Sequence, residues 1–299
     1  MHELNQLAKL KKINIPKNWS TTLIVELLAL NVSKAELQTL RERTSKKKYE
    51  STTVTTIRIT NLVKQFGDIN AVDGVTLDIR EGELFSLLGP NGAGKTTILN
   101  ILTGILKPTK GTVIIGGYNV SSNLEEIKTK IGVCPQQAAV FNFLSARENI
   151  EFFGNLHAIP RKELKERMEH LLEILDLVEV STRKAKGYSG GMLRKLNLII
   201  ALISDPEIAF LDEPTVGMDP RACRATWNFI ETLKKRHKTI ILTTHYIEEA
   251  EALSDRVGIL DYGKLIELGT PQELLERYGA NNLEEVFLNI TGRRIVEGI

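Results

Sequence analysis

The chain has 299 residues, of which 42% are hydrophobic and 25% charged, and its formal net charge is +2. These fractions are ordinary for a globular protein, and the length suits one large α/β domain with an appendage. No run of 18 apolar residues is present, and Cys134 and Cys223 lack the CxxC spacing of zinc and redox motifs. We therefore expect a chain that is neither secreted nor membrane-spanning and that works in the reducing cytosol.

The first 53 residues carry a basic excess, with ten Lys and Arg against five Asp and Glu. Apolar spacing on both sides of Pro16 predicts three short helices, so residues 1–50 are interpreted as a basic helical appendage and linker. The run LALNVSKAELQTL resembles the turn and second helix of helix-turn-helix DNA-binding domains, although Glu26 and Leu27 break that pattern. Packing on the main domain or on a partner is the favoured role, and nucleic-acid binding through residues 1–50 is the alternative.

Strand patterns define the main domain, which we assign to residues 51–299. An alternating β-branched run begins it at 51–60. Further strands are predicted at 75–79, 84–88, 111–117, 131–136, 208–212 and 239–245, with a hairpin at 256–269. Between about 137 and 202 only helical stripes occur, so a helical insert divides a sheet-based core. A helical tail is predicted at 271–299, with helix starts at Thr270 and Asn282.

The stretch GPNGAGKTT lies between the apolar run at 84–88 and a helical pattern at 97–106. It fits G-x-x-x-x-G-K-[ST], the phosphate-binding loop, in the strand–loop–helix context that this motif requires. Backbone N–H groups of such a loop surround phosphate oxygens, and the following helix directs its positive end at the same anion. We expect Lys95 to reach the β- and γ-phosphates and Thr96 to ligate Mg²⁺. The candidate nucleotide-binding residues of this loop are Gly89, Pro90, Asn91, Gly92, Ala93, Gly94, Lys95, Thr96 and Thr97.

The run IAFLDEP at 208–214 is an apolar strand that ends in two carboxylates. Because side chains alternate along a strand, Asp212 and Glu213 are expected to point apart and to have different roles. Asp212 suits the binding of Mg²⁺ through water, and Glu213 suits a general base that orients and deprotonates the attacking water. Together with the loop, this pair predicts hydrolysis of ATP or GTP.

A Ser-Gly-Gly turn at 189–191 precedes an amphipathic run at 192–202. The Ser189 hydroxyl, the free amides of Gly190 and Gly191 and the helix dipole would form a second anion site. One phosphate does not need two helix N-termini from the same chain. The turn therefore predicts that a second subunit completes the first site.

In this order the motifs resemble those of the ATP-binding subunit of ABC transporters, over roughly residues 54–290. They correspond to the Walker A loop, the Q-loop at Gln136, the signature YSGGM, Walker B in LDEP, the D-loop GMDP with Asp219, and the switch histidine His245. Phe66 occupies the place of the aromatic that stacks on adenine. The resemblance implies a P-loop NTPase of the ABC ATPase type, with a mixed sheet and an inserted α-helical subdomain.

The resemblance also implies a head-to-tail dimer in which ATP lies between the 89–97 loop of one subunit and the 189–191 turn of the other. Asp219 would run along the dimer interface, and Gln136 would link the nucleotide to the helical insert. In such transporters that insert docks a cytoplasmic helix of a membrane permease. The implied catalytic residues are Glu213, His245 and Gln136, and the implied Mg²⁺ ligands are Thr96, Gln136 and Asp212.

The signature departs from the common form of the family, since Met192 stands where Gln is usual and cannot hydrogen-bond as Gln would. With GMDP and the tail LEEVFLNITGRR, it resembles the subgroup that serves ABC-2 type exporters of drugs, lipids, polysaccharides or ions. The resemblance implies an ATP-hydrolysing subunit, peripheral at the inner face of the cell membrane, that drives a separate permease. The alternative is a soluble ABC ATPase or sensor that binds DNA through its N-terminal appendage.

Overall fold

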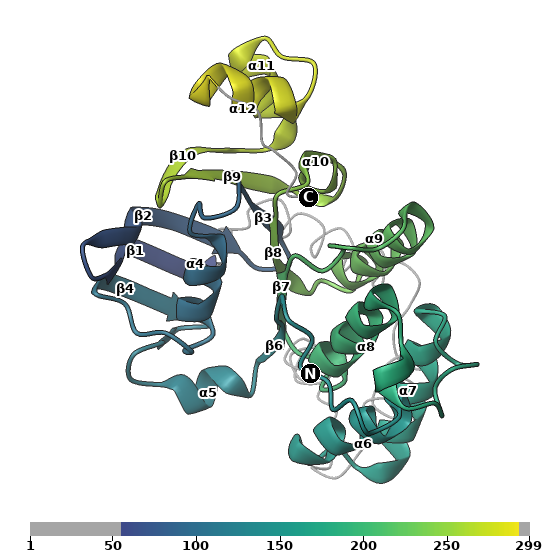
Figure 1. Cartoon of the computed structure of the whole chain (residues 1–299). Coiled ribbons are helices and arrows are strands. Elements are labelled where there is room, and N and C mark those ends of the chain that lie inside the picture. The colour runs from purple at the N-terminus through teal and green to yellow at the C-terminus, as the bar shows by residue number, and fades with distance from the viewer. Residues whose placement is uncertain (1–54, 293–299) are drawn as a thin grey trace, which may run out of the picture. The chain divides into compact units, whose positions relative to one another are not determined.

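The computed structural model describes residues 55–292, which are built on two β-sheets (Figure 1). The predicted appendage at 1–50 with its nucleic-acid contact, the start of the 51–60 strand and the end of the tail lie outside the described residues. Of the helices that the structure describes, none combines the length and the hydropathy needed to cross a membrane.

The larger sheet has the strand order β10–β9–β3–β8–β7–β6. Its members are β3 (Leu84–Leu88), β6 (Ile131–Cys134), β7 (Ile208–Asp212), β8 (Thr239–Thr244), β9 (Arg256–Asp261) and β10 (Lys264–Gly269). The strands from β9 to β6 are parallel, and β10 is the antiparallel partner of β9. Every residue of β3, β7 and β8 is buried, as expected for parallel strands that are covered on both faces. The carboxyl ends of these strands meet at one edge of the sheet.

The smaller sheet is antiparallel, with the order β2–β1–β4–β5. It consists of β1 (Thr55–Phe66), β2 (Ile69–Arg80), β4 (Lys110–Ile115) and β5 (Tyr118–Asn119), and α5 (Leu124–Lys128) follows it. β1 and β2 form a hairpin at Gly67, whose φ of 55° suits a tight turn. The strand predicted at 75–79 is therefore only part of a longer β2, because its pairing with β1 continues to Ile69.

Side chains of β7 alternate between two hydrophobic cores. Ile208 and Phe210 face the core that contains α4 (Lys95–Leu102) and the smaller sheet, whereas Ala209 and Leu211 face the core of the helical part. The helical part comprises α6 (Ala146–Leu156), α7 (Arg161–Ile174), the short helix η1 (Ala185–Gly187) and α8 (Gly190–Leu202), with α9 (Pro220–Lys235) beside it. Figure 1 shows α4 and α8 on opposite sides of the six-stranded sheet. The predicted α/β class, with a mixed sheet and an inserted helical subdomain, is confirmed for residues 55–292.

The strand predicted at 131–136 ends at Cys134. Pro135 has no N–H with which to continue the ladder, so the chain leaves the sheet there. Gln136 therefore lies in the loop after β6, and its side chain reaches the end of the neighbouring strand β7.

Helices α10 (Ile247–Leu253), α11 (Pro271–Tyr278) and α12 (Leu283–Thr291) cover the β9 side of the sheet. Both predicted starts in the tail are capped: the Thr270 hydroxyl accepts from the Glu273 N–H at 3.1 Å, and Asn282 accepts from the Glu285 N–H at 2.9 Å. Gly279 ends α11 in the left-handed conformation. The tail is thus a pair of short helices packed on its own small core.

Candidate active site

The 89–97 loop joins the end of β3 to the start of α4. Two of its glycines have no room for a side chain. A Cβ on Gly89 would lie 2.3 Å from the carbonyl oxygen of Leu260, and a Cβ on Gly94 would lie 2.4 Å from that of Ala71. Gly94 also has a φ of 102°, which favours glycine. The base of the loop is therefore pressed against β9 and β2, while its tip at 91–92 is exposed.

The Lys95 ammonium lies inside this loop. It is 4% exposed and donates hydrogen bonds to the carbonyl oxygens of Gly89 (2.7 Å) and Pro90 (3.1 Å). Its Nζ also lies 3.6 Å from Glu213 Oε1. Burial lowers the pKa of Lys95, and the carboxylates of Glu213 and Asp212 oppose that shift. The loop thus holds a buried cation at its centre, where a bound anion would gain most from it.

Glu213 follows the last residue of β7 and has a φ of 48°, so the chain turns out of the strand there. Its Oε1 lies 3.1 Å from His245 Nδ1, and its Oε2 accepts a hydrogen bond from Gln136 Nε2 at 2.9 Å. Burial would raise the pKa of Glu213, but the contact with His245 and the charge of Lys95 outweigh it, and the pKa is lowered. At neutral pH Glu213 is therefore a carboxylate, the form that a general base requires.

Asp212 has different surroundings from Glu213, as expected. The cause is the turn of the chain at Glu213, which lies beyond the end of β7, and not the alternation of side chains along a strand. Thr96 Oγ1 donates to Asp212 Oδ1 at 3.2 Å, and the Thr243 hydroxyl donates to the same oxygen. Burial raises the pKa of Asp212, and these two hydrogen bonds oppose the rise. The two carboxylates of the LDEP motif thus have separate sets of hydrogen-bond partners.

The oxygen atoms of Thr96 and Asp212 suit Mg²⁺. Residues 55–292 contain no group of three or more His, Cys, Asp or Glu side chains that could hold a metal ion by themselves. A magnesium ion in a nucleotide site does not need one, because it keeps waters and phosphate oxygens in its coordination shell and takes one or two ligands from the protein. The donor set therefore fits the ion that the sequence predicts.

The signature turn lies apart from this cluster. Ser189 and Gly190 are exposed, and the Ser189 hydroxyl caps α8 by accepting from the Met192 N–H at 3.2 Å. Within the described part of the chain, no hydrogen bond or ion pair joins 189–191 to the 89–97 loop. The structure thus brings Lys95, Thr96, Gln136, Asp212, Glu213 and His245 together and leaves the signature outside.

Two other predicted site residues are also open to solvent. Asp219 is exposed at the start of α9, where its carboxylate accepts from the N–H groups of Arg221 and Ala222, both at 3.0 Å. Phe66 is 48% exposed at the end of β1, with Lys64 Nζ 4.9 Å from the centre of its ring. A half-exposed aromatic ring of this kind can stack on a base.

Comparison with known proteins identifies the family. The sequence profile of the family described as "ABC transporter" matches residues 72–216. The "Daunorubicin resistance ATP-binding protein DrrA3" of Streptomyces coeruleorubidus is 38% identical over 232 residues, which are 78% of this chain and 73% of that protein. The chain belongs to the ABC transporter family. It is accordingly an ATP-binding protein and an ATPase.

Solved structures agree with this assignment. A chain described as "Structure of ATP binding subunit of ABC transporter" has a TM-score of 0.74 and 26% identity, over 79% of this chain and all of that one. A second, the "Dimeric structure of a post-hydrolysis state of the ATP-binding cassette MJ0796 bound to ADP and Pi", has a TM-score of 0.67 and 29% identity, over 72% and 98% of the two chains. The ABC ATPase fold is therefore supported by sequence and by structure.

The signature helix of this ABC ATPase also holds its Q-loop, a link that the sequence did not predict. Asn197 is 1% exposed in α8; its Oδ1 accepts from the Ala139 N–H at 3.0 Å, and its Nδ2 donates to the Pro135 carbonyl at 2.9 Å. Arg194, one turn earlier, donates to the Gln136 carbonyl. The backbone on both sides of Gln136 is thus fixed to α8. In the sequence, only the presence of the polar Asn197 within the apolar run 192–202 indicated this link.

Two further buried residues support the site and were also missed. Thr243 donates to Asp212, as described above, and the sequence indicated it only by its place two residues before His245 in TIILTTH. Glu249 is fully buried in α10, and its Oε1 accepts from Thr215 Oγ1 at 2.7 Å and from the Trp227 indole at 3.0 Å. Burial raises the pKa of Glu249. It connects the helix that follows His245 to the segment that precedes the D-loop.

Proposed function

We propose that this ABC ATPase pairs head-to-tail with a second ATPase subunit when it binds ATP, and that this closure drives a separate membrane permease. The permease would be an exporter, and the ATPase would lie at the inner face of the cell membrane. The name of the relative from S. coeruleorubidus, a daunorubicin resistance protein, supports export. The dimeric structure of MJ0796 supports pairing.

One observation carries the proposal of a dimer. The helices that follow the two anion-binding turns, α4 and α8, pack in different hydrophobic cores, on opposite faces of the six-stranded sheet. Within residues 55–292 no hydrogen bond or ion pair joins the two turns, and their helices begin in separate parts of the fold. The exposed 189–191 turn is therefore available to the nucleotide of another subunit, and the 89–97 loop lacks its second wall in a single chain.

The residues around Lys95 suit hydrolysis in the following roles. Glu213 would accept the proton of the attacking water, with His245 and Gln136 holding its two oxygens. Lys95 would exchange its carbonyl partners and Glu213 for phosphate oxygens. Thr96 and Asp212, with Gln136 nearby, would hold Mg²⁺, which when bound would neutralise phosphate charge. Phe66 would stack on the adenine.

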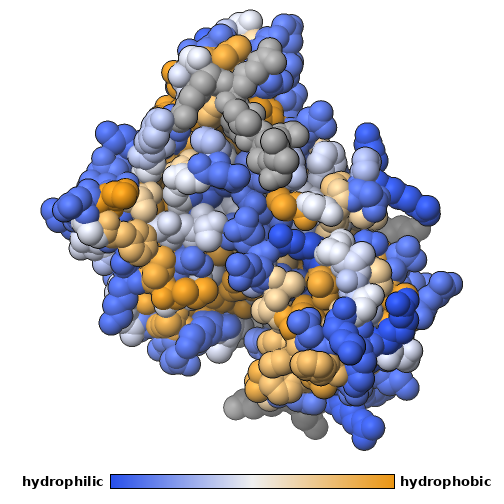
Figure 2. All heavy atoms as spheres, viewed as in Figure 1, coloured by the Kyte–Doolittle hydropathy of each residue, from blue (hydrophilic) through white to orange (hydrophobic). Residues whose placement is uncertain are grey.

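An exposed aromatic cluster on the helical part supports docking of a permease. Phe141, Phe152 and Phe153 contact one another, with ring centres 5.0–5.9 Å apart, and Phe143 is 77% exposed. Figure 2 shows apolar side chains gathered at the lower right, where the helical part lies. The segment 141–153 follows the Q-loop, whose backbone is held by α8. A partner seated on this cluster would therefore contact the segment that leads directly to Gln136.

Glu213→Gln tests the dimer. The amide keeps a hydrogen-bonding side chain but cannot take a proton, so ATP should bind, hydrolysis should stop, and an ATP-dependent dimer should accumulate on size-exclusion chromatography with light scattering. Glu166→Gln, the same change at an exposed position on α7, should behave like the wild type. A Glu213→Gln chain that stays monomeric in saturating ATP and Mg²⁺ would contradict the proposed pairing.

Phe143→Asp tests the permease surface. The variant should lose retention on membrane vesicles from the source cell, because a charge placed in an apolar interface is unpaired. Ile105→Asp is the control, since Ile105 is 65% exposed outside the aromatic cluster. Equal retention of the two variants would place the docking surface elsewhere.

A further inference from the structure

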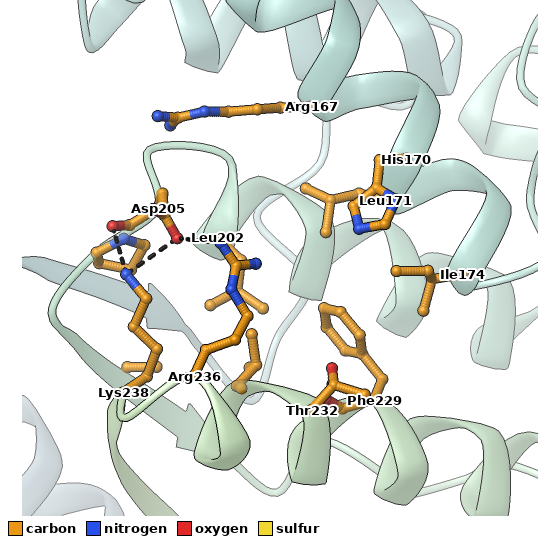
Figure 3. A pocket seen from close by; sticks show the side chains of 13 residues that line it. Arg167, His170, Leu171, Ile174, Leu202, Asp205, Phe229, Thr232, Arg236 and Lys238 are labelled. Atoms are coloured by element: carbon orange, nitrogen blue, oxygen red, sulfur yellow. Dashed lines mark hydrogen bonds and ion pairs between the residues drawn. The ribbon is translucent and has the colours of Figure 1, made fainter. Parts of the chain in front are cut away.

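A cavity of about 470 Å³ lies between α7, the end of α8, the turn before β7 and α9 (Figure 3). Its volume falls within the range of about 300–1,000 Å³ that is typical of small-molecule sites. The apolar part of the lining includes Leu171, Ile174, Leu202, Phe229 and Leu233. Phe229 is 3% exposed and is fixed by the surrounding core. The cavity therefore offers a preformed apolar surface.

Charged side chains surround this apolar surface, and most of them are cations. The lining includes Arg167, Arg236 and Lys238 against a single carboxylate, Asp205. Asp205 Oδ1 lies 3.0 Å from Lys238 Nζ and 3.6 Å from Arg236. Lys238 Nζ also donates to the Asp205 backbone carbonyl at 3.0 Å, and dashed lines in Figure 3 mark both contacts of Lys238. The Asp205 carboxylate thus pairs with two cations, Arg236 and Lys238. Arg167 pairs with Glu163, which is not part of the lining. A positive charge is left uncompensated at the rim.

The cavity is separate from the nucleotide site. Asp205 precedes β7 and Lys238 precedes β8, whereas Glu213 and His245 follow the other ends of the same two strands. Five residues of strand span roughly 17 Å at about 3.3 Å per residue. A ligand in the cavity and a nucleotide on the 89–97 loop can therefore bind at the same time.

We propose that this cavity binds a small amphipathic anion, a molecule with one carboxylate, sulfonate or phosphate head and an apolar body. The head lies beside Arg236 and Lys238, next to the Asp205 carboxylate, and pairs with the positive charge that Asp205 leaves uncompensated. The body covers Phe229 and the leucines. Neither feature suffices alone: a bare inorganic anion leaves the apolar surface wet, and a neutral apolar molecule leaves the charge unpaired.

The test titrates decanoate into the full-length chain by isothermal calorimetry, with decanol and inorganic phosphate as matched probes. Decanoate should bind at least about tenfold more tightly than either, because only decanoate satisfies both parts of the site. Vesicles of anionic phospholipid form a third arm, which distinguishes a free amphiphile from a membrane surface. Binding to vesicles without binding to decanoate would overturn the proposal.

Two variants locate the binding. Arg236→Gln should weaken decanoate by about tenfold or more, since it removes a charged partner of the head. Lys235→Gln also replaces a cation by glutamine, at the last residue of α9 and outside the lining, and should have no effect. Thr232→Trp places a large side chain at the wall of the cavity and should abolish binding, whereas Thr232→Ser should retain it.

ATP hydrolysis serves as the folding control for these variants, because none of the three positions belongs to the hydrolysis site. The proposal would be overturned if decanol or inorganic phosphate bound as tightly as decanoate. It would also be overturned if decanoate binding were unchanged in both Arg236→Gln and Thr232→Trp.

Discussion

The hydroxyl of Thr243 provides a direct test of how the Walker B aspartate is held. Thr243 is fully buried, and its hydroxyl donates to Asp212 Oδ1. Thr243→Val keeps the shape of the side chain and removes that donor. The Glu213 N–H also contacts this hydroxyl at 3.2 Å, but it keeps its bond to the Thr243 carbonyl at 3.0 Å. The main loss is therefore one hydrogen bond to a buried carboxylate.

A hydrogen bond to a charged group contributes about 1.5–3 kcal/mol, so the free energy of unfolding should fall by that amount near neutral pH. For a domain of this size, each kcal/mol corresponds to roughly 2–4 °C in Tm. The variant should therefore melt roughly 3–12 °C below the wild type. The Mg²⁺ concentration that half-saturates ATP hydrolysis should also rise, because Asp212 is our proposed metal ligand.

The loss of stability should depend on pH with a definite sign. Burial raises the pKa of Asp212, so the native chain holds a proton in a pH range where the unfolded chain has released it, and stability falls as pH rises through that range. Without the Thr243 donor the pKa of Asp212 rises further. The destabilisation should therefore be larger at high pH and should shrink as pH falls toward the ordinary range of an aspartate.

Thermal unfolding of the nucleotide-free chain by circular dichroism, at about pH 5 and about pH 8, measures both effects. Thr226→Val is the control, since Thr226 is also fully buried but donates only to the sulfur of Met218, at 3.4 Å. The reasoning fails if Thr243→Val and Thr226→Val have the same Tm at both pH values.

Three further predictions concern the site. Lys95→Ala should lose ATP binding, measured with a fluorescent ATP analogue, and tight binding by this variant would contradict our interpretation of the loop. Asn197→Leu should retain ATP binding but lower kcat, because it removes the hydrogen bonds that hold the Q-loop backbone and leaves buried polar groups unpaired, at a cost of about 1–3 kcal/mol each. An unchanged kcat would show that the contact between α8 and the Q-loop does not affect hydrolysis. Glu249→Gln should keep hydrolysis near the wild-type rate, since an amide oxygen can still accept from Thr215 and Trp227. Glu249→Leu should lower both the rate of hydrolysis and Tm. Equal hydrolysis rates for the two variants would exclude Glu249 as a positioning residue.

Contiguous motifs were predictable because their function depends on local geometry. The 89–97 loop needs a strand before it and a helix after it, and both can be recognised within the 23 residues from 84 to 106. The strand–loop–helix order is confirmed in the structure, and the glycines at 89 and 94 lie where another backbone approaches. The ABC ATPase fold followed from the order of such motifs.

The supporting residues were not predictable in the same way. Asn197 contacts the Q-loop about sixty positions away in sequence, and Thr243 reaches Asp212 from a neighbouring strand. These contacts depend on the strand order β3–β8–β7–β6, which places distant segments side by side and which periodicity does not reveal. The turn at Glu213 was missed for a related reason, since a positive φ at a non-glycine residue has no pattern in the sequence.

The central claim, that each hydrolysis site is shared between two subunits, is tested most directly by mixing two inactive variants. Lys95→Ala disables the 89–97 loop, and Ser189→Arg disables the exposed signature turn. In a mixed head-to-tail dimer one site carries both lesions and the other carries none. Our account predicts that each variant alone is inactive and that an equal mixture recovers up to about a quarter of the wild-type ATPase rate, because half of the dimers are mixed and each has one intact site. No recovery on mixing, with both variants folded and a mixed dimer detected in ATP, would contradict it.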